Sequence, residues 1–232
     1  MAGFLLCGTA AGLVTSTATA SAATGTTAST LYREAIVSTH AWSVHYASSS
    51  VQAKQTLLES GDAGPASGSQ TVLLGTGSIN IVVIGGLTYL KGNEGGLQAL
   101  AGLSASQAAE GAGQWIEFAT DDAAFAQVVA GVRSDDLADE LALKGPLTLG
   151  HPQTLDGYAV EAIDGRQTVG KTSMRVVLYV RATGTHVPVE EDSVNAQGRP
   201  TDAVHVAYSK WGEHVRPLAP QASISIGPIS AV

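Results

Sequence analysis

The residues that could act as nucleophiles do not stand in the patterns that nucleophilic catalysis needs. A serine hydrolase places its serine in Gly-x-Ser-x-Gly, at a sharp strand-to-helix turn beside the oxyanion hole. The nearest stretch, Gly102-Leu103-Ser104-Ala105-Ser106, lacks the second glycine. The only cysteine, Cys7, lies in a segment that we interpret below as a signal peptide. No group of titratable residues is spaced for acid-base work either, so we predict no catalytic residues and no enzyme.

Histidines and carboxylates, which ligate metals, are also poorly placed. The six histidines are scattered, and His40 and His45 form the only pair close in sequence. We favour two ordinary histidines there over a zinc site. Glu190-Glu191-Asp192 could attract calcium, but successive residues of a strand point to alternating faces, which favours a solvated edge. We therefore predict no metal site and no cofactor.

The sequence offers neither a phosphate-binding loop nor a basic surface for nucleic acid. Gly75-Thr76-Gly77-Ser78 looks like a phosphate-cradling loop, but the strand-like run Ile79–Ile84 follows it, where a phosphate loop would lead into a helix. We interpret it as a hairpin turn. The net charge is -8 at pH 7, and the 12 Lys and Arg form no cationic stripe.

Short β-prone segments surround a helical middle part. The predicted strands cover residues 42–47, 51–59, 69–74, 79–84, 87–90, 114–118, 158–163, 172–180, 187–192, 203–208 and 223–226. The predicted helices cover 29–40, with Ser29 as N-cap, parts of 95–113, then 121–132 and 134–143. Turn signals stand at 61–65, 75–77, 85–86, 156–157, 164–165, 183–184 and 197–198.

Such closely spaced strands favour antiparallel hairpins, because parallel strands need long crossover connections. No linker or internal repeat divides the chain. We therefore predict one α+β domain over residues 29–232, a strongly curved antiparallel β-sheet, or half-barrel, with helices against one face.

The first 22 residues are typical of a secretory signal peptide. The apolar run Phe4–Val14 precedes small residues that end in Ala20-Ser21-Ala22, an A-x-A pattern that signal peptidase accepts. The run is too short to span a membrane. The first basic residue is only Arg33, which a start codon assigned too far downstream would explain; an Ala-rich disordered tail is the alternative. We expect 1–22 to be a signal, 23–28 a flexible leader, and the mature protein to be secreted or associated with the cell envelope.

The apolar composition raises the main functional question. Hydrophobic residues make up 44% of the chain, but aromatic residues only 5%. The run Ile79–Ile84 breaks strict alternation, which predicts apolar side chains on both faces of one strand. A well-packed core and a ligand cavity both explain this pattern. The many small residues in 95–113 and 123–130 favour a cavity, because they leave room beside the sheet.

Several stretches of the sequence resemble segments of a known protein family. They are LDGYAV at 155–160, VLYV at 177–180, ATGTHVP at 182–188, YSKWGEHV at 208–215, Ala219-Pro220, LTYLKG at 87–92 and GQWI at 113–116. In these the chain resembles the LppX/LprG group of exported actinobacterial lipoproteins, which is similar in fold to the LolA and LolB lipoprotein carriers. The resemblance covers residues 29–220.

This resemblance implies a half-open β-barrel around helices, with an apolar cavity between them that holds acyl chains. Members of the group carry a small residue directly before a lipidated cysteine, whereas Leu6 precedes Cys7 here. We therefore expect Cys7 not to be lipidated and the protein to be released or only loosely associated with the wall.

We expect an exported, non-catalytic and monomeric carrier that binds a lipid or acylated ligand between the sheet and its helices. The alternative is an extracytoplasmic sensor or interaction domain whose outer sheet surface binds a protein of the cell envelope. The residues expected to line the apolar cavity are Trp42, Val44, Tyr46, Leu74, Ile81, Val83, Tyr89, Trp115, Phe118, Phe125, Val129, Leu137, Leu141, Val177 and Tyr179.

Overall fold

The first element that the structure describes is a helix. The computed structural model describes residues 26–52, 54–122, 125–169, 172–195 and 203–226, so the predicted signal peptide and the turn at 197–198 lie outside it. Helix α1 covers Ala28–Ala41, and the Thr27 side chain accepts a hydrogen bond from the Thr30 N–H. Thr27 is thus the N-cap, and the prediction of Ser29 was wrong, because the helix begins one residue before it.

A run of antiparallel hairpins follows α1. Its strands are β1 (Val44–Gln52), β2 (Gln55–Ala63), β3 (Ser67–Leu74), β4 (Gly77–Ile84), β5 (Leu87–Gly92) and, after a helical interruption, β6 (Ile116–Ala119). The prediction of one strand over 51–59 was wrong, because the β1–β2 turn falls inside it. Lys54 adopts a left-handed conformation in this turn, with a φ of 68°. No glycine or proline stands there to predict the turn from the sequence.

The helical insert is confirmed, but its helices are short. They are α2 (Glu94–Ala99), α3 (Ala105–Gly111), α4 (Ala126–Val129) and α5 (Ser134–Glu140). The predicted helix over 121–132 shrinks to the four residues of α4, with 123–124 outside the described part. The prediction for 134–143 was too long, since α5 ends at Glu140. Among the described residues, no helix is long and apolar enough to cross a membrane.

The second group of strands returns after the insert. It comprises β7 (Lys144–Leu149), β8 (Gln153–Leu155), β9 (Tyr158–Val169), β10 (Thr172–Arg181), β11 (Pro188–Asn195) and β12 (Val204–Ser209). Strands β7 and β8 were not predicted. The turn predicted at 164–165 was wrong, because β9 runs straight through it. Gly165 serves close packing instead: a Cβ there would lie 2.9 Å from a methyl group of Leu147.

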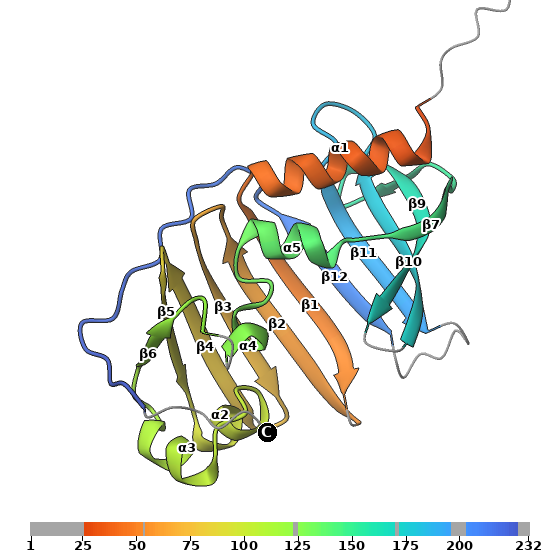
Figure 1. Ribbon diagram of the computed structural model, residues 1–232. Coiled ribbons are helices and arrows are strands. Elements are labelled where there is room, and N and C mark those ends of the chain that lie inside the picture. The colour runs from red at the N-terminus through yellow and green to blue at the C-terminus, as the bar shows by residue number, and fades with distance from the viewer. Residues whose placement is uncertain (1–25, 53, 123–124, 170–171, 196–202, 227–232) are drawn as a thin grey trace, which may run out of the picture.

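All these strands form one antiparallel sheet, in the order β6-β5-β4-β3-β2-β1-β12-β11-β10-β9-β7, with β8 beside β9. The sheet curves strongly and does not close, and the helices lie over one of its faces (Figure 1). The predicted α+β class is therefore confirmed. The predicted strand at 223–226 was wrong: Ile224 makes an isolated parallel bridge to Ile116 at the β6 edge.

We call the covered face the inner face and the opposite one the outer face. On the inner face, helices α1 and α5 pack with Val44 and Tyr46 of β1 in one apolar cluster, which includes Leu31 and Leu137. A second apolar cluster joins α2 and α4 to β4 and β5, with Ile81 among its fully buried residues. Both clusters follow from strand alternation, since every second residue of a strand meets the helices.

The segment before α5 is held on the middle of the inner face. Arg133 bridges Gly64 in parallel, and the Ser134 N–H donates to the Gly64 carbonyl over 3.2 Å. Beside this bridge, a Cβ on Gly68 would lie only 1.8 Å from the Val132 carbonyl oxygen. Glycine at position 68 thus lets the backbone of the insert touch the sheet.

We expect Gly68→Ala to lower the free energy of unfolding by roughly 2 kcal/mol or more, because the Val132 backbone must move away from the sheet. Urea unfolding followed by circular dichroism measures this. Gly86→Ala is the matched control, because no atom lies within 4 Å of the added methyl group. Equal stability of the two variants would contradict the role assigned to Gly68.

Candidate functional site

Strand register places polar side chains in two neighbouring rows on the inner face. In the first row, Tyr208 of β12 pairs with Tyr46 of β1, and Tyr46 pairs with Gly61 of β2. A Cβ on Gly61 would lie 2.9 Å from the Tyr46 hydroxyl, so the ring lies over this glycine. Gln70 of β3, which is buried, pairs with Gly61 and extends the row.

The second row contains two glutamates. Glu191 of β11 pairs with Val206 of β12, Val206 with Ser48 of β1, and Ser48 with Glu59 of β2. The Ser48 hydroxyl donates a hydrogen bond of 2.8 Å to the Glu59 carboxylate. Glu191 is buried, at 8% exposure. These residues place carboxyl groups on a face that is otherwise largely apolar, with some neutral polar side chains such as Gln70 and Ser193.

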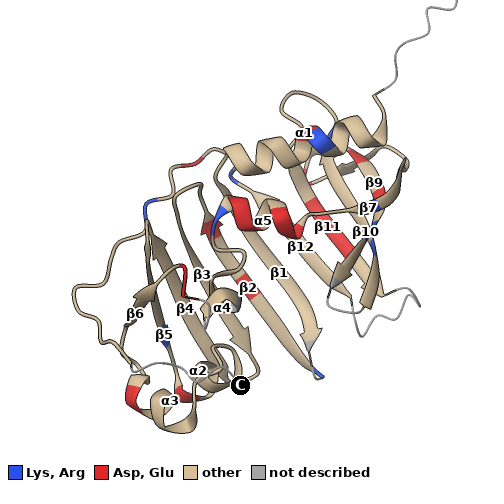
Figure 2. Ribbon diagram, viewed as in Figure 1, with Lys and Arg blue, Asp and Glu red and all other residues tan. Residues whose placement is uncertain are grey.

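Helix α5 adds a third carboxyl group above these rows. Glu140, its last residue, interacts electrostatically with both Glu59 and Glu191. We call Glu59, Glu140 and Glu191 the carboxyl cluster. Figure 2 shows acidic residues on α5 and on β11. Three elements that are distant in sequence thus bring negative charges together.

The cluster shifts the protonation of its own members. The pKa of Glu191 is raised to about 7, mainly by burial and in addition by the charges of Glu140 and Asp192. The pKa of Glu140 is also raised to about 7, first by burial of its carboxyl and then by Glu59 and Asp136. Part of Glu140 is nevertheless exposed, so the carboxyl lies among protein atoms while the residue remains reachable from solvent.

Two buried phenols lie next to the cluster. Burial, followed by nearby carboxylates, raises the pKa of Tyr46 and of Tyr208 well above the usual value, so both stay neutral. The Tyr46 hydroxyl is buried and has no hydrogen-bond partner within the described part of the chain. Such a group costs free energy unless something else satisfies it. Glu140 and Glu191 can therefore exchange protons near neutral pH, and their oxygens and the Tyr46 oxygen can accept from a hydrogen-bond donor.

Most of the predicted cavity residues lie on the inner face or in the helices that cover it. Phe118 and Phe125 stack with their ring centroids 3.7 Å apart. Val129 is partly buried beside them. The others in this group are buried, except for the partly exposed Leu74: Val44, Tyr46, Ile81, Val83, Leu137 and Leu141. These side chains largely pack against one another.

The remaining predicted residues lie elsewhere. Strand β10 buries Val176 and Leu178, which places Val177 and Tyr179 on the outer face. Tyr89 also points outward, since it pairs with Val82 between the inward-facing Ile81 and Val83. Trp115 lies near the Lys91 ammonium, 5.8 Å from its ring centroid. Trp42 follows α1 and is 42% exposed.

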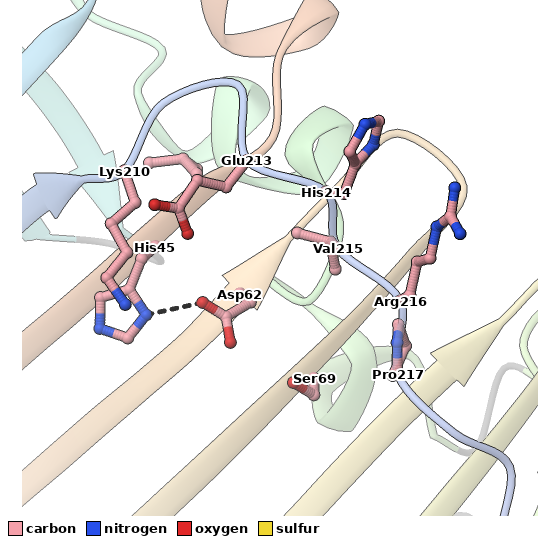
Figure 3. A pocket seen from close by; sticks show the side chains of 10 residues that line it. His45, Asp62, Ser69, Lys210, Glu213, His214, Val215, Arg216 and Pro217 are labelled. Atoms are coloured by element: carbon pink, nitrogen blue, oxygen red, sulfur yellow. Dashed lines mark hydrogen bonds and ion pairs between the residues drawn. The ribbon is translucent and has the colours of Figure 1, made fainter.

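A hollow of about 240 Å³ lies on the outer face, where the segment after β12 crosses β1, β2 and β3 (Figure 3). Charged residues line it, among them Lys210, Glu213 and Arg216. His45 and Asp62 form an ion pair of 2.7 Å inside it. This lining suits water and ions better than an acyl chain.

The hollow also contains Ser69, but its residues do not form a catalytic triad. Strand pairing places Asp62 between His45 and Ser69, and Figure 3 shows the serine on the far side of the aspartate. In a triad the histidine lies between the other two, because it must take the proton of the serine. These three residues therefore offer no activated nucleophile.

A possible cation site lies further along the outer face. Asp192 and Glu190 point the same way from β11, and His205 of β12 pairs with Asp192. One ligand atom from each lies within 4.8 Å of the other two, and His205 Nδ1 is 2.9 Å from Asp192 Oδ1. All three remain partly or largely exposed and already bind one another. The predicted alternation of Glu190, Glu191 and Asp192 is confirmed, with Glu191 alone on the inner face. The predicted solvated edge was wrong, because β11 lies between β10 and β12 and Glu191 is buried.

Comparison with known proteins adds evidence on the fold. No protein-family model matches the sequence, and no curated protein does. The solved structure of LprF from Mycobacterium bovis superposes with a TM-score of 0.53 at 14% identity, covering 84% of this chain and 99% of that one. The Mycobacterium tuberculosis lipoprotein LppX gives 0.52 at 14% identity, covering 80% and 95%. This chain has the LprF and LppX fold. The predicted structural likeness to that group is thereby confirmed.

Sequence reasoning missed the carboxyl cluster. The sequence pattern treats Glu191 together with Glu190 and Asp192, and it contains no signal for Glu59 or Glu140. One signal in the sequence points to Glu191. Because side chains alternate along a strand, Glu191 points to the same side as Val187 and Val189, which are buried. A charged residue among buried positions of a strand is unusual, which makes Glu191 a candidate for a functional residue.

The raised pKa values predict a pH-dependent stability. A carboxyl whose pKa is higher in the folded than in the unfolded chain keeps a proton that the unfolded chain loses. The free energy of unfolding should therefore fall as pH rises from about 5 to 8. Glu191→Gln should remove part of this fall, raising stability by roughly 2 to 3 kcal/mol at pH 8 and hardly at pH 5.

Urea unfolding at several pH values between 5 and 8 measures this effect. Asp139→Asn, at an exposed carboxyl of α5, is the control and should leave the pH profile unchanged. A Glu191→Gln variant whose stability falls with pH as steeply as that of the natural protein would show that Glu191 ionises normally.

Proposed function

We propose that this protein is an exported, non-catalytic carrier that holds the acyl chains of a lipid or lipoprotein against the inner face of its sheet. Residues 1–22 would direct it out of the cytoplasm, and the mature domain would act in or beyond the cell envelope. The likeness in fold to LppX, which is itself a lipoprotein, is compatible with this role.

One observation carries the proposal: apolar side chains on the inner face stay partly exposed toward one end of the central strands. Leu57 of β2 pairs with Leu74 of β3, and both are partly exposed. Val204 and Val206 of β12 behave in the same way. On the same face, Val44 and Ala63 at the other end of β1 and β2 are buried.

The helices explain this difference. Helices α1 and α5 cross the end of the sheet where β1 begins, and they do not reach the other end of β1 and β12 (Figure 1). An acyl chain lying on the uncovered end would remove these side chains and its own methylene groups from water. Each buried methylene contributes about 0.8 kcal/mol, so a few suffice for measurable binding.

Native mass spectrometry of protein purified from its own host tests the proposal directly. We expect a co-purifying ligand with the mass of a lipid or acylated molecule. A chain that is reproducibly free of ligand, and that takes up no fluorescent acyl probe, would contradict the proposal.

A second function has one observation in its favour. Leu58 and Leu73 pair with each other on the outer face and are 44% and 41% exposed. An exposed apolar pair suits contact with a protein partner, as expected of a sensor or interaction domain. In that case a pull-down would give one stoichiometric partner, and lipid would not affect it.

Adjacent leucines of β2 separate the two functions. We expect Leu57→Asn, on the inner face, to weaken binding of a fluorescent acyl probe about tenfold, because it removes apolar surface from the binding face. Leu58→Asn, on the outer face, is the matched control and should bind the probe like the natural protein. Probe titrations monitored by fluorescence measure both. If the two variants bind alike, the inner face is not the acyl site.

A further inference from the structure

The inner face combines apolar and acidic groups in a way that a plain hydrocarbon ligand does not require. The partly exposed Val206 lies between Glu191 and Ser48 in one row of the sheet, and Ser48 holds the Glu59 carboxylate. The proposed acyl surface therefore runs directly into the carboxyl cluster. A ligand with a polar end would place that end there.

We infer that the carboxyl cluster of Glu59, Glu140 and Glu191, with the Tyr46 hydroxyl, binds the protonated amine head group of an amphiphilic ligand. This inference rests on the proposed carrier function and names the class of molecule carried. The amphiphile would lay its chain on the partly exposed apolar residues beside the cluster.

The buried Tyr46 hydroxyl is the first argument. Tyr46 is only 2% exposed, and its hydroxyl has no partner among the described residues. Charges of Glu59 and Glu140 act on this phenol, which places it beside the cluster. An unpaired buried hydroxyl is uncommon in a folded protein. A ligand that reaches the cluster could supply the missing hydrogen bond.

The sign of the local charge is the second argument. The groups that act on Glu140 and Glu191 are all acidic. Tyr32 of α1, whose pKa the charge of Glu191 helps to raise, and Tyr208 are neutral phenols. Arg133, just before α5, pairs over 3.5 Å with Asp136, a carboxylate outside the cluster whose charge also raises the pKa of Glu140. A positive ligand would relieve the repulsion between carboxylates, whereas an anionic head group would increase it.

Hydrogen-bonding capacity is the third argument. An ammonium group offers three N–H donors and no acceptor. Ionised carboxyls only accept, and the phenol oxygen of Tyr46 can accept as well. Glu140, which is reachable from solvent, would meet the head group first, and the buried Glu191 would lie deeper. The cluster therefore matches an amine better than it matches a phosphate or a carboxylate.

Binding of such a head group must depend on pH. Below the raised pKa values of Glu140 and Glu191, both near 7, the two carboxyls are largely protonated and attract the amine weakly. Above these values they are ionised, while an alkyl amine keeps its proton up to about pH 10. Affinity for the amine should therefore rise as the pH increases through 7.

Isothermal titration calorimetry with three probes of equal chain length tests the inference: dodecylamine, dodecanoate and dodecyl glucoside, at pH 5.5 and pH 8. At pH 8 we expect dodecylamine to bind about tenfold tighter than either of the others. This advantage should shrink severalfold at pH 5.5. Glu191→Gln and Glu140→Gln should each reduce it at pH 8, while Asp139→Asn, a neighbour on α5, should keep it.

The outcomes separate the head group from the carrier function. Equal binding of all three probes, unchanged by Glu191→Gln, would leave the carrier function standing and overturn the amine site. Tighter binding of the glucoside at both pH values would assign the cluster to neutral hydroxyl groups and would also overturn it. Absence of binding by every probe would count against the carrier function and the amine site together. Circular dichroism confirms that each variant is folded.

Discussion

The pairing of β1 with β12 is the contact on which the rest of the structure depends. It aligns His45–Ser50 with Val204–Ser209 and joins a group of strands built before the helical insert to a group built after it. Without this ladder the molecule would consist of two smaller sheets, each with a further exposed edge. With it, the inner face becomes continuous across β11, β12, β1 and β2, and side chains from both halves come to lie side by side.

The connections at its two ends then fix the position of the helical insert. It leaves the first group of strands at β5 and must reach the second at β7, so it folds across the inner face. Contacts of the segment before α5 with Gly64 and Gly68 hold the last helix over the centre of the sheet. Because α5 is short, it ends above the sheet, where Glu140 comes under the electrostatic influence of Glu59 on β2 and acts on Glu191 of β11.

Burying carboxyls on an apolar face is costly, and the structure lowers that cost by proton uptake. Two glutamates with pKa values near 7 are largely neutral in mild acid, where they add little repulsion. At higher pH the same residues become charges that a binding partner could compensate. A core designed only for stability would place leucine or valine at these positions, as the adjacent row with Leu57 and Leu74 does.

The amino-acid sequence by itself determined the local features: α1, the helical insert, most of the strands, the glycine turns at 75–77 and 85–86, and the opposite directions of Glu191 and its neighbours. These depend on interactions within a few residues. The sequence did not reveal the Lys54 turn or the continuation of β9 through Gly165, where tertiary contacts override local preference. Nor did it reveal the carboxyl cluster, or His205 beside Asp192. Those groupings arise from strand register and helix docking between residues far apart in the chain, which only the tertiary structure decides.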